Sequence, residues 1–293
     1  MGYGGYSQED RLERSVSLGY HTKAVHEIFN QRGINEAMSP YGMTIRESRD
    51  SDEHPNSVAI IIALDVTGSM ERIPHKLVKD GLPTIMANII SAGIPDPQVM
   101  FIAIGDHKCD FAPLQVGQFE SNDALLDHWL TTVWLEGHGG ANGGESYSLA
   151  HYLAARYTSI DCFEKRKQKG ILITIGDEFN HSSFNSGDIE ELFGVTEQSS
   201  HAASDLIAEA QESYHVFHLH VKEGSNGTNP RIIDSWKKAL GENCVVVNNS
   251  LDIPMVISKL IYGMADTNQF INNVEVIPAV APNQTPGSYT PML

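Results

Sequence analysis

The chain has 293 residues, of which 41% are hydrophobic and 19% are charged, values typical of a globular protein with a full core. Its formal net charge of −17 at pH 7 argues against nucleic-acid binding by the bulk surface and suits a basic or cation-binding partner better. No run of about 18 apolar residues is present, so the sequence predicts neither a transmembrane helix nor a membrane partner.

Residues 1–57 are expected to form an arm or decoration in front of the main domain. Residues 1–20 are rich in glycine, serine and charge, and we expect them to be mobile unless a partner holds them. Apolar residues on one helical face predict a short helix at 22–31, and an edge strand is expected at 41–49.

The core is expected to begin with a strand at 58–64, because this apolar, β-branched run does not alternate with polar residues and so suits a strand buried on both faces. Apolar residues at a spacing of three and four predict a helix over 77–90, kinked at Pro83. A second buried strand is expected at 98–105, followed by an edge strand at 111–119 that returns antiparallel to it.

Strands and helices continue to alternate as far as residue 264. Further helices are expected at 121–133, 147–157, 188–193, 199–213, 230–240 and 251–264, and further strands at 170–178, 214–221 and 244–248. This order predicts an α/β domain at 58–264 with a doubly wound, mostly parallel sheet and one antiparallel edge strand. The proline-rich tail at 265–293 is expected to be disordered or to dock on a neighbour as an arm.

A group of oxygen-bearing side chains follows the first core strand directly. Asp65, Thr67 and Ser69 place a carboxylate and two hydroxyls at every second position, and Gly68 allows the tight turn between them. Open α/β sheets bind their ligands at the carboxyl ends of the strands. Oxygen ligands without Cys or His suit Mg²⁺, so the sequence predicts a magnesium site here.

The pattern Asp65-x-Thr67-x-Ser69 after a hydrophobic strand resembles the DxSxS/T motif of von Willebrand factor A domains, the metal-ion-dependent adhesion site. The resemblance covers 58–264 and is to the intracellular, microbial or phage type of the family. It implies a bound Mg²⁺, or Mn²⁺ or Ca²⁺ in its place, with one coordination position open to an Asp or Glu of a protein partner.

The family takes its metal ligands from three loops, of which the first is formed here by the motif itself. Asp177 fits the third loop because it follows a later buried strand, and its neighbour Glu178 is the alternative. In the second loop the sequence departs from the family, because alanine follows the paired glycines where a threonine is usual. Asn142 is therefore the favoured ligand, and Glu145 and Ser146 are the alternatives.

Other residues near this edge bear on phosphate, substrate and Zn²⁺ binding. An acid rather than a lysine follows the glycine-rich loop, which excludes a P-loop for phosphate. The histidines of three loops, His107, His138 and His181, are interpreted as a polar rim in preference to a substrate site. His218 and His220 share a strand face and are interpreted as partly buried sheet residues in preference to a Zn²⁺ pair.

The leading hypothesis is a non-enzymatic, metal-dependent protein-binding module that serves as an adaptor or assembly subunit. The family resemblance implies an AAA+ ATPase as one kind of partner, and a homo-oligomer is the other. The alternative is a metal-dependent hydrolase that uses the surplus of acids and histidines, for which two bridged ions would be diagnostic.

The expected location is cytoplasmic. Three widely spaced cysteines without a CxxC pattern indicate a reducing compartment rather than a disulfide framework. The amino-terminal residues also carry no basic and apolar secretory signal.

Overall fold

The computed structural model describes residues 5, 7–20, 22–70, 72–77, 82–91, 93–94, 96–137 and 143–265. Its largest sheet has six strands in the order β10-β9-β6-β2-β3-β4. The strands are β2 (Ser57–Asp65), β3 (Asp96–Ile104), β4 (Leu114–Val116), β6 (Gly170–Gly176), β9 (Tyr214–Val221) and β10 (Cys244–Val247). All neighbouring strands are parallel except β3 and β4, which confirms the predicted fold class.

Strand β2 lies inside the sheet, and all nine of its residues are buried. Ile61 is paired with Met100 of β3 on one side and with Leu172 of β6 on the other. Ile60 packs into the core on one face of the sheet, while Ile61 packs into the core on the opposite face. Both faces of this strand are therefore apolar, which explains why its sequence shows no alternation.

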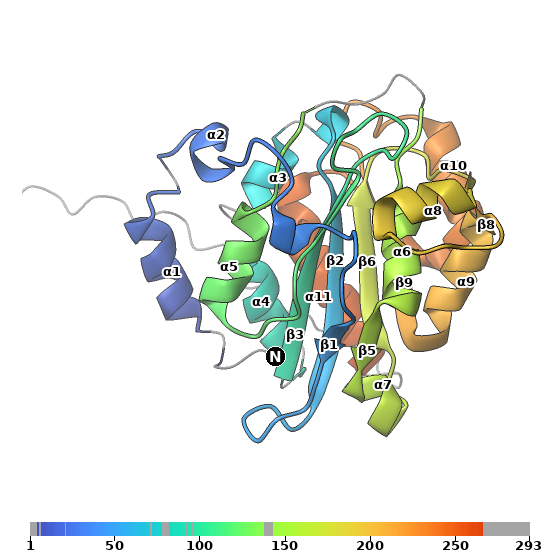
Figure 1. Ribbon diagram of the computed structural model, residues 1–293. Coiled ribbons are helices and arrows are strands. Elements are labelled where there is room, and N and C mark those ends of the chain that lie inside the picture. The colour runs from blue at the N-terminus through green and yellow to red at the C-terminus, as the bar shows by residue number, and fades with distance from the viewer. Residues whose placement is uncertain are drawn as a thin grey trace, which may run out of the picture.

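Helices cover both faces of the sheet (Figure 1). The helices on one face are α3 (Ile73–Lys76), α4 (Leu82–Ser91), α5 (Asp123–Thr131) and α11 (Ile253–Ala265). Those on the other face are α6 (Tyr147–Arg156), α7 (Asp161–Arg166), α8 (Ser186–Phe193), α9 (Ala203–Ser213) and α10 (Pro230–Leu240). Ile253, Ile257 and Ile261 illustrate the packing, because their spacing of four places all three on the buried stripe of α11.

Several elements differ from the sequence predictions. The single kinked helix expected over 77–90 is described as α3 and α4, with residues 78–81 outside the described part of the chain. Pro83 lies in the first turn of α4, where its missing N–H leaves no helical hydrogen bond unmade. The short strands β5 (Thr158–Ile160), β7 (Ser183–Phe184) and β8 (His201–Ala202), and helix α7, were not predicted.

The amino-terminal region folds onto the domain. Within residues 1–20, helix α1 (Gln8–Ser17) was not predicted, and it lies against α5 (Figure 1). Arg14 Nε is 2.9 Å from Asp123 Oδ2, and the Tyr20 hydroxyl donates to Asp127 Oδ2 at 2.6 Å.

The rest of this region is made of short elements. The helix expected at 22–31 is limited to α2 (Val25–Ile28). The predicted edge strand is β1 (Arg46–Ser48), and it pairs in parallel with β5 in a separate two-stranded sheet instead of joining the main one. Three 3₁₀ turns complete the outer elements, namely η1 (Glu36–Met38), η4 (Gly241–Asn243) and η5 (Ser250–Asp252).

Helix α11 ends at Ala265, and the predicted tail beyond it lies outside the described residues. Among the described helices, none combines the length and the apolar character needed to cross a membrane.

Candidate metal centre

Four of the predicted ligands meet where β2 and β6 end. Asp65 is the last residue of β2, and its Oδ1 accepts the backbone N–H of Thr67 at 2.9 Å and the Thr67 hydroxyl at 2.6 Å. The turn η2 (Gly68–Met70) brings the Ser69 hydroxyl within 3.3 Å of the Thr67 hydroxyl. Ser69 donates in turn to Asp177 Oδ1 at 2.6 Å, so the four side chains form one connected cluster.

The two carboxylates of this cluster are fully buried. Asp65 and Asp177 are each 0% exposed, and within the described residues neither has a Lys or Arg partner. The Tyr147 hydroxyl donates to Asp65 Oδ2 at 2.5 Å. Burial and, to a smaller extent, the nearby charge of Asp177 together raise the pKa of Asp65 to about 7, although the hydrogen bonds from Thr67 and Tyr147 act in the opposite direction. Hard oxygen donors that carry buried, uncompensated negative charge fit Mg²⁺.

Glu145 adds a third buried carboxyl group at this end of the sheet. It is 4% exposed, and its Oε2 is buried without a hydrogen-bond partner in the described structure. Burial, together with the negative charges of Asp65 and Asp106, raises its pKa to about 10. The sequence expectation that acids crowd this edge is therefore met.

Of the candidate ligands in the second loop, Glu145 and Ser146 are described by the structure and Asn142 is not. Asn142, the favoured ligand, lies outside the described part of the chain. Glu145 keeps a free ligand atom, whereas the Ser146 hydroxyl accepts the backbone N–H of His107 at 2.9 Å and lies 2.8 Å from His107 Nδ1. In the third loop, Glu178 accepts from the Asn226 side chain at 2.5 Å, so Asp177 alone of that pair contacts Ser69.

Sequence reasoning missed the loop that follows β9. The Asn226 backbone N–H donates to Asp177 Oδ2 at 2.9 Å, and the Ser225 N–H donates to the Ser69 carbonyl at 3.0 Å. A Cβ atom at Gly224 would overlap the Asp177 side chain, so this close approach requires glycine. The signal was available, because a Ser-Asn-Gly turn at the carboxyl end of a strand beside β6 must lie near Asp177.

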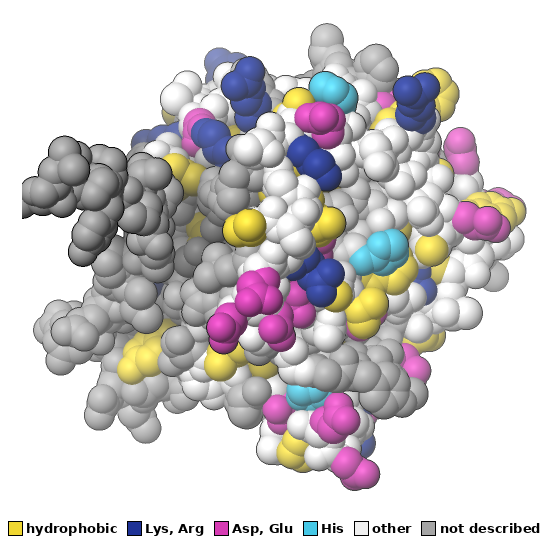
Figure 2. Space-filling view, turned by 90° about the vertical axis from the view of Figure 1, so that its left-hand side faces the viewer, with side chains coloured by type: hydrophobic (Ala, Val, Ile, Leu, Met, Phe, Trp, Pro, Cys, Tyr) yellow, Lys and Arg dark blue, Asp and Glu magenta, His cyan; other side chains and the backbone are white. Residues whose placement is uncertain are grey.

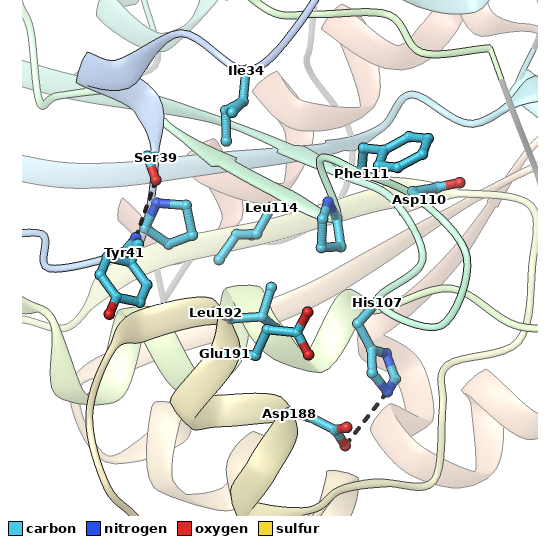
Figure 3. Close-up of a pocket in the computed structure, with 12 residues that line it drawn as sticks. Ile34, Ser39, Tyr41, His107, Asp110, Phe111, Leu114, Asp188, Glu191 and Leu192 are labelled. Carbon is cyan, nitrogen blue, oxygen red and sulfur yellow. Dashed lines mark hydrogen bonds and ion pairs between the residues drawn. The ribbon is translucent and has the colours of Figure 1, made fainter.

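A second group of side chains lies next to the cluster. Asp106, His107 and His181 each offer a ligand atom, and these atoms all lie within 4.8 Å of one another. His107 also borders a cavity of about 280 Å³, shown in Figure 3 together with Asp188, which faces its ring. The third histidine of the predicted rim, His138, lies outside the described residues.

The other histidine pair is built into the sheet. His218 is fully buried, and its ring stacks on Trp236 with the ring centroids 3.6 Å apart. Its Nδ1 lies 2.9 Å from the Thr174 hydroxyl, and His220 Nε2 lies 2.8 Å from the Gly227 carbonyl. These contacts agree with the interpretation of both histidines as sheet residues.

No protein-family model and no curated protein matches this chain. Among solved structures, it is similar to the pilus adhesin SpaC from Lactobacillus rhamnosus GG in its open conformation, with a TM-score of 0.52 and 12% identity over 75% of this chain. The chain spans 31% of that protein's length.

Two further structures are similar at lower scores. The von Willebrand factor type A protein from Catenulispora acidiphila has a TM-score of 0.44 and 11% identity, covering 71% of this chain and 43% of that one. The von Willebrand factor domain of the pili tip protein Mfa5 from Porphyromonas gingivalis has a TM-score of 0.46 and 7% identity, covering 80% and 99%. At such identities the likeness concerns the fold alone: this chain and the matched part of SpaC share an α/β fold, which here has a mixed, mostly parallel six-stranded sheet.

Proposed function

We propose that this protein is a non-enzymatic, metal-dependent protein-binding module. Asp65, Thr67, Ser69 and Asp177 would hold one Mg²⁺, with Asn142 or Glu145 as the second-loop ligand. The observation that carries the proposal is the cluster itself, in which two buried carboxylates and two hydroxyls are connected without a cationic side chain among the described residues.

Charge explains why such an ion would recruit a partner. Mg²⁺ together with ionised Asp65 and Asp177 is neutral, so an open coordination position can still attract a carboxylate from outside the chain. Entry of Glu145 as an ionised ligand would make the site negative and weaken that attraction. Asn142 as the second-loop ligand therefore suits docking, whereas Glu145 suits a structural ion.

The surface beside the site supports a protein partner. The cavity in Figure 3 is lined by the carboxylates of Asp110, Asp188 and Glu191, and no Lys or Arg is among its lining residues. Tyr41 and Phe111, also in its lining, are 67% and 83% exposed. A partner that presents basic and apolar side chains next to its metal-binding acid would complement this surface. A second copy of this chain and an AAA+ ATPase are the two partner classes that we propose.

An intracellular, cytoplasmic location is part of the proposal. Its support is that all three cysteines, Cys109, Cys162 and Cys244, are free thiols, as expected in a reducing compartment. SpaC is a pilus adhesin, and that description belongs to SpaC alone.

The proposal is tested by Mg²⁺ titration and by partner capture. Isothermal titration calorimetry should show one Mg²⁺ per wild-type chain and none for Asp65→Ala. A protein captured from extract of the native cells in Mg²⁺ should be lost both in EDTA and with Asp65→Ala. Asp234→Ala, which changes an exposed acid on α10, is the matched control and should behave as wild type. Unchanged capture in EDTA and with Asp65→Ala would exclude the metal bridge.

The rival hydrolase remains as a second candidate because of the Asp106, His107 and His181 group beside the cluster. Two-metal hydrolysis requires two ions about 4 Å apart that share a bridging ligand. A crystal grown with Mg²⁺ that contained such a bridged pair would favour catalysis, and a single ion held by the Thr67 and Ser69 hydroxyls would favour docking.

A further inference from the structure

Three loop residues next to the proposed magnesium site form a separate set of possible ligands. Asp106 and His107 follow β3, and His181 follows β6. Their side chains are 0%, 5% and 7% exposed, and the offered ligand atoms lie within 4.8 Å of one another. This set shares no residue with the Asp65 cluster, and it contains imidazoles where that cluster contains only oxygens.

The two rings each direct a nitrogen towards Asp106. His181 Nε2 lies 2.7 Å from Asp106 Oδ1, and His107 Nδ1 lies 3.8 Å from the same oxygen. The opposite nitrogen of His107, Nε2, lies 3.6 Å from Asp188 Oδ2 (Figure 3). A metal-ligating histidine usually donates its other ring N–H to a carboxylate, and this hydrogen bond fixes the orientation of the ring.

We propose that Asp106, His107 and His181 bind a transition-metal ion of the Zn²⁺ class. Two imidazoles and one carboxylate suit Zn²⁺ or Co²⁺, whereas Mg²⁺ prefers oxygen ligands alone. Zinc bonds to nitrogen and oxygen of about 2.0 Å in tetrahedral geometry place two ligand atoms roughly 3.3 Å apart. The 2.7 Å between His181 Nε2 and Asp106 Oδ1 therefore has to open only slightly. Three protein ligands leave a fourth position for water or for a side chain of the partner.

In this structure the Lys108 side chain makes a contact that disfavours metal binding by His181. Its Nζ lies 3.1 Å from His181 Nδ1, and an ammonium group can only donate, so Nδ1 accepts and the ring proton is on Nε2. The ion requires Nε2 without its proton, which then moves to Nδ1 and ends the contact with Lys108. Removal of the Lys108 side chain should therefore tighten metal binding.

The ion would connect the loops that surround the proposed docking site. The loop after β3 carries Asp106, and the loop after β6 carries both Asp177 and His181. The Ser146 hydroxyl, at the start of α6, accepts the backbone N–H of His107, a contact that does not use the ring nitrogen needed for the ion. Binding at this second site would hold all three segments in place.

The proposal is tested by adding Co²⁺ to the metal-free full chain in the presence of excess Mg²⁺. The measured quantity is the visible absorption of Co²⁺ that is bound by histidine. Wild type and Asp65→Ala should both bind one equivalent, so failure of the magnesium site would not affect the result. His181→Ala and His107→Ala should weaken Co²⁺ binding by about ten-fold or more. Lys108→Ala should strengthen it several-fold, and Zn²⁺ should displace the Co²⁺ signal.

His26→Ala is the matched control, because His26 is an exposed histidine on α2 far from these loops in the sequence. Circular dichroism checks that each variant is folded, and His181→Gln replaces His181→Ala if the smaller side chain disrupts folding. The proposal is overturned if wild type shows no signal, or if the signal survives both histidine substitutions. A signal lost in Asp65→Ala but kept in folded His181→Gln would also overturn it, because Co²⁺ would then occupy the first site.

Discussion

The carboxyl group of Glu145 is buried among other acids. Its protonation therefore affects the free energy of unfolding. Its pKa of about 10 in the folded chain lies above the ordinary glutamate pKa of 4.5. Between these two values the folded state keeps a proton that the unfolded state loses, so the free energy of unfolding falls as the pH rises. The slope is on the order of 1 kcal/mol per pH unit while this difference is complete.

We expect Glu145→Gln to stabilise the metal-free protein, since the amide keeps the shape of the side chain and has no proton to release on unfolding. The gain in melting temperature in EDTA should be larger at pH 8 than at pH 6, because the cost of the buried carboxyl grows with pH. Glu242→Gln, at an exposed glutamate, is the control and should change little at either pH. A lower melting temperature for Glu145→Gln at pH 8 would show that this carboxyl group stabilises the fold.

At this scale, the sequence predicted the residues whose positions follow from strand ends. Asp65 and Asp177 could be paired because buried parallel strands put their carboxyl ends at one edge, and β2 and β6 are indeed neighbours. Tyr147 and Gly224 could not be found in this way, since their contacts depend on how α6 and the loop after β9 cross the sheet. For Asn142 the prediction stays open.

At the scale of elements, the loop between β9 and α10 packs against Asp177 at the candidate metal centre. Gly224→Ala would force this loop or the Asp177 carboxylate to move. We expect a loss of stability of about 1–3 kcal/mol, as for other overpacked sites, together with weaker Mg²⁺ binding. Urea unfolding and Mg²⁺ calorimetry measure the two effects. Gly33→Ala is the control, because a Cβ atom there meets nothing within 4 Å.

The docking of α1 on α5 gives a second prediction at this scale. Tyr20→Phe removes the hydroxyl that donates to Asp127, and the side chain of Tyr20 is buried. We expect a loss of about 1–3 kcal/mol, as for other hydrogen bonds to charged groups. Thermal unfolding measures this loss of stability. Tyr41→Phe is the control, because the Tyr41 side chain is 67% exposed. Equal stability of the two variants would mean that α1 docks without help from this bond.

The sequence predicted the long elements and missed the short ones for one physical reason. A strand such as β2 or a helix such as α11 carries its burial pattern in its own residues. Segments such as β5 and β7 have three and two residues, and they become strands only because a partner strand lies beside them. Helix α1 was missed because its residues are mostly polar and its packing partner lies more than 100 residues away.

At the scale of the whole molecule, the net charge of −17 acts against the folded state through self-repulsion. Figure 2 shows one face, on which acidic side chains form a cluster near the middle and Lys and Arg side chains lie mainly above it. Long-range repulsion of this kind is screened by salt much more than short buried contacts are.

We therefore expect the melting temperature in EDTA to rise when NaCl is raised from about 20 to about 200 mM, a range over which the screening length falls to roughly 7 Å. An uncharged osmolyte at matched osmolality is the control for effects other than screening. A fall in melting temperature would mean that surface ion pairs, such as Arg156 with Glu209, outweigh the general repulsion.

The parallel arrangement of the strands gives the molecule two ends with different tolerance to engineering. Strand β2 has nine residues and rises about 3.3 Å per residue, so its first residue, Ser57, lies about 26 Å from Asp65. The exposed turn at residues 52–53 is at that far end, just before β2 begins. A reporter peptide or fluorescent label grafted into this turn can follow the protein in cells while the edge that carries Asp65 and Asp177 stays unmodified.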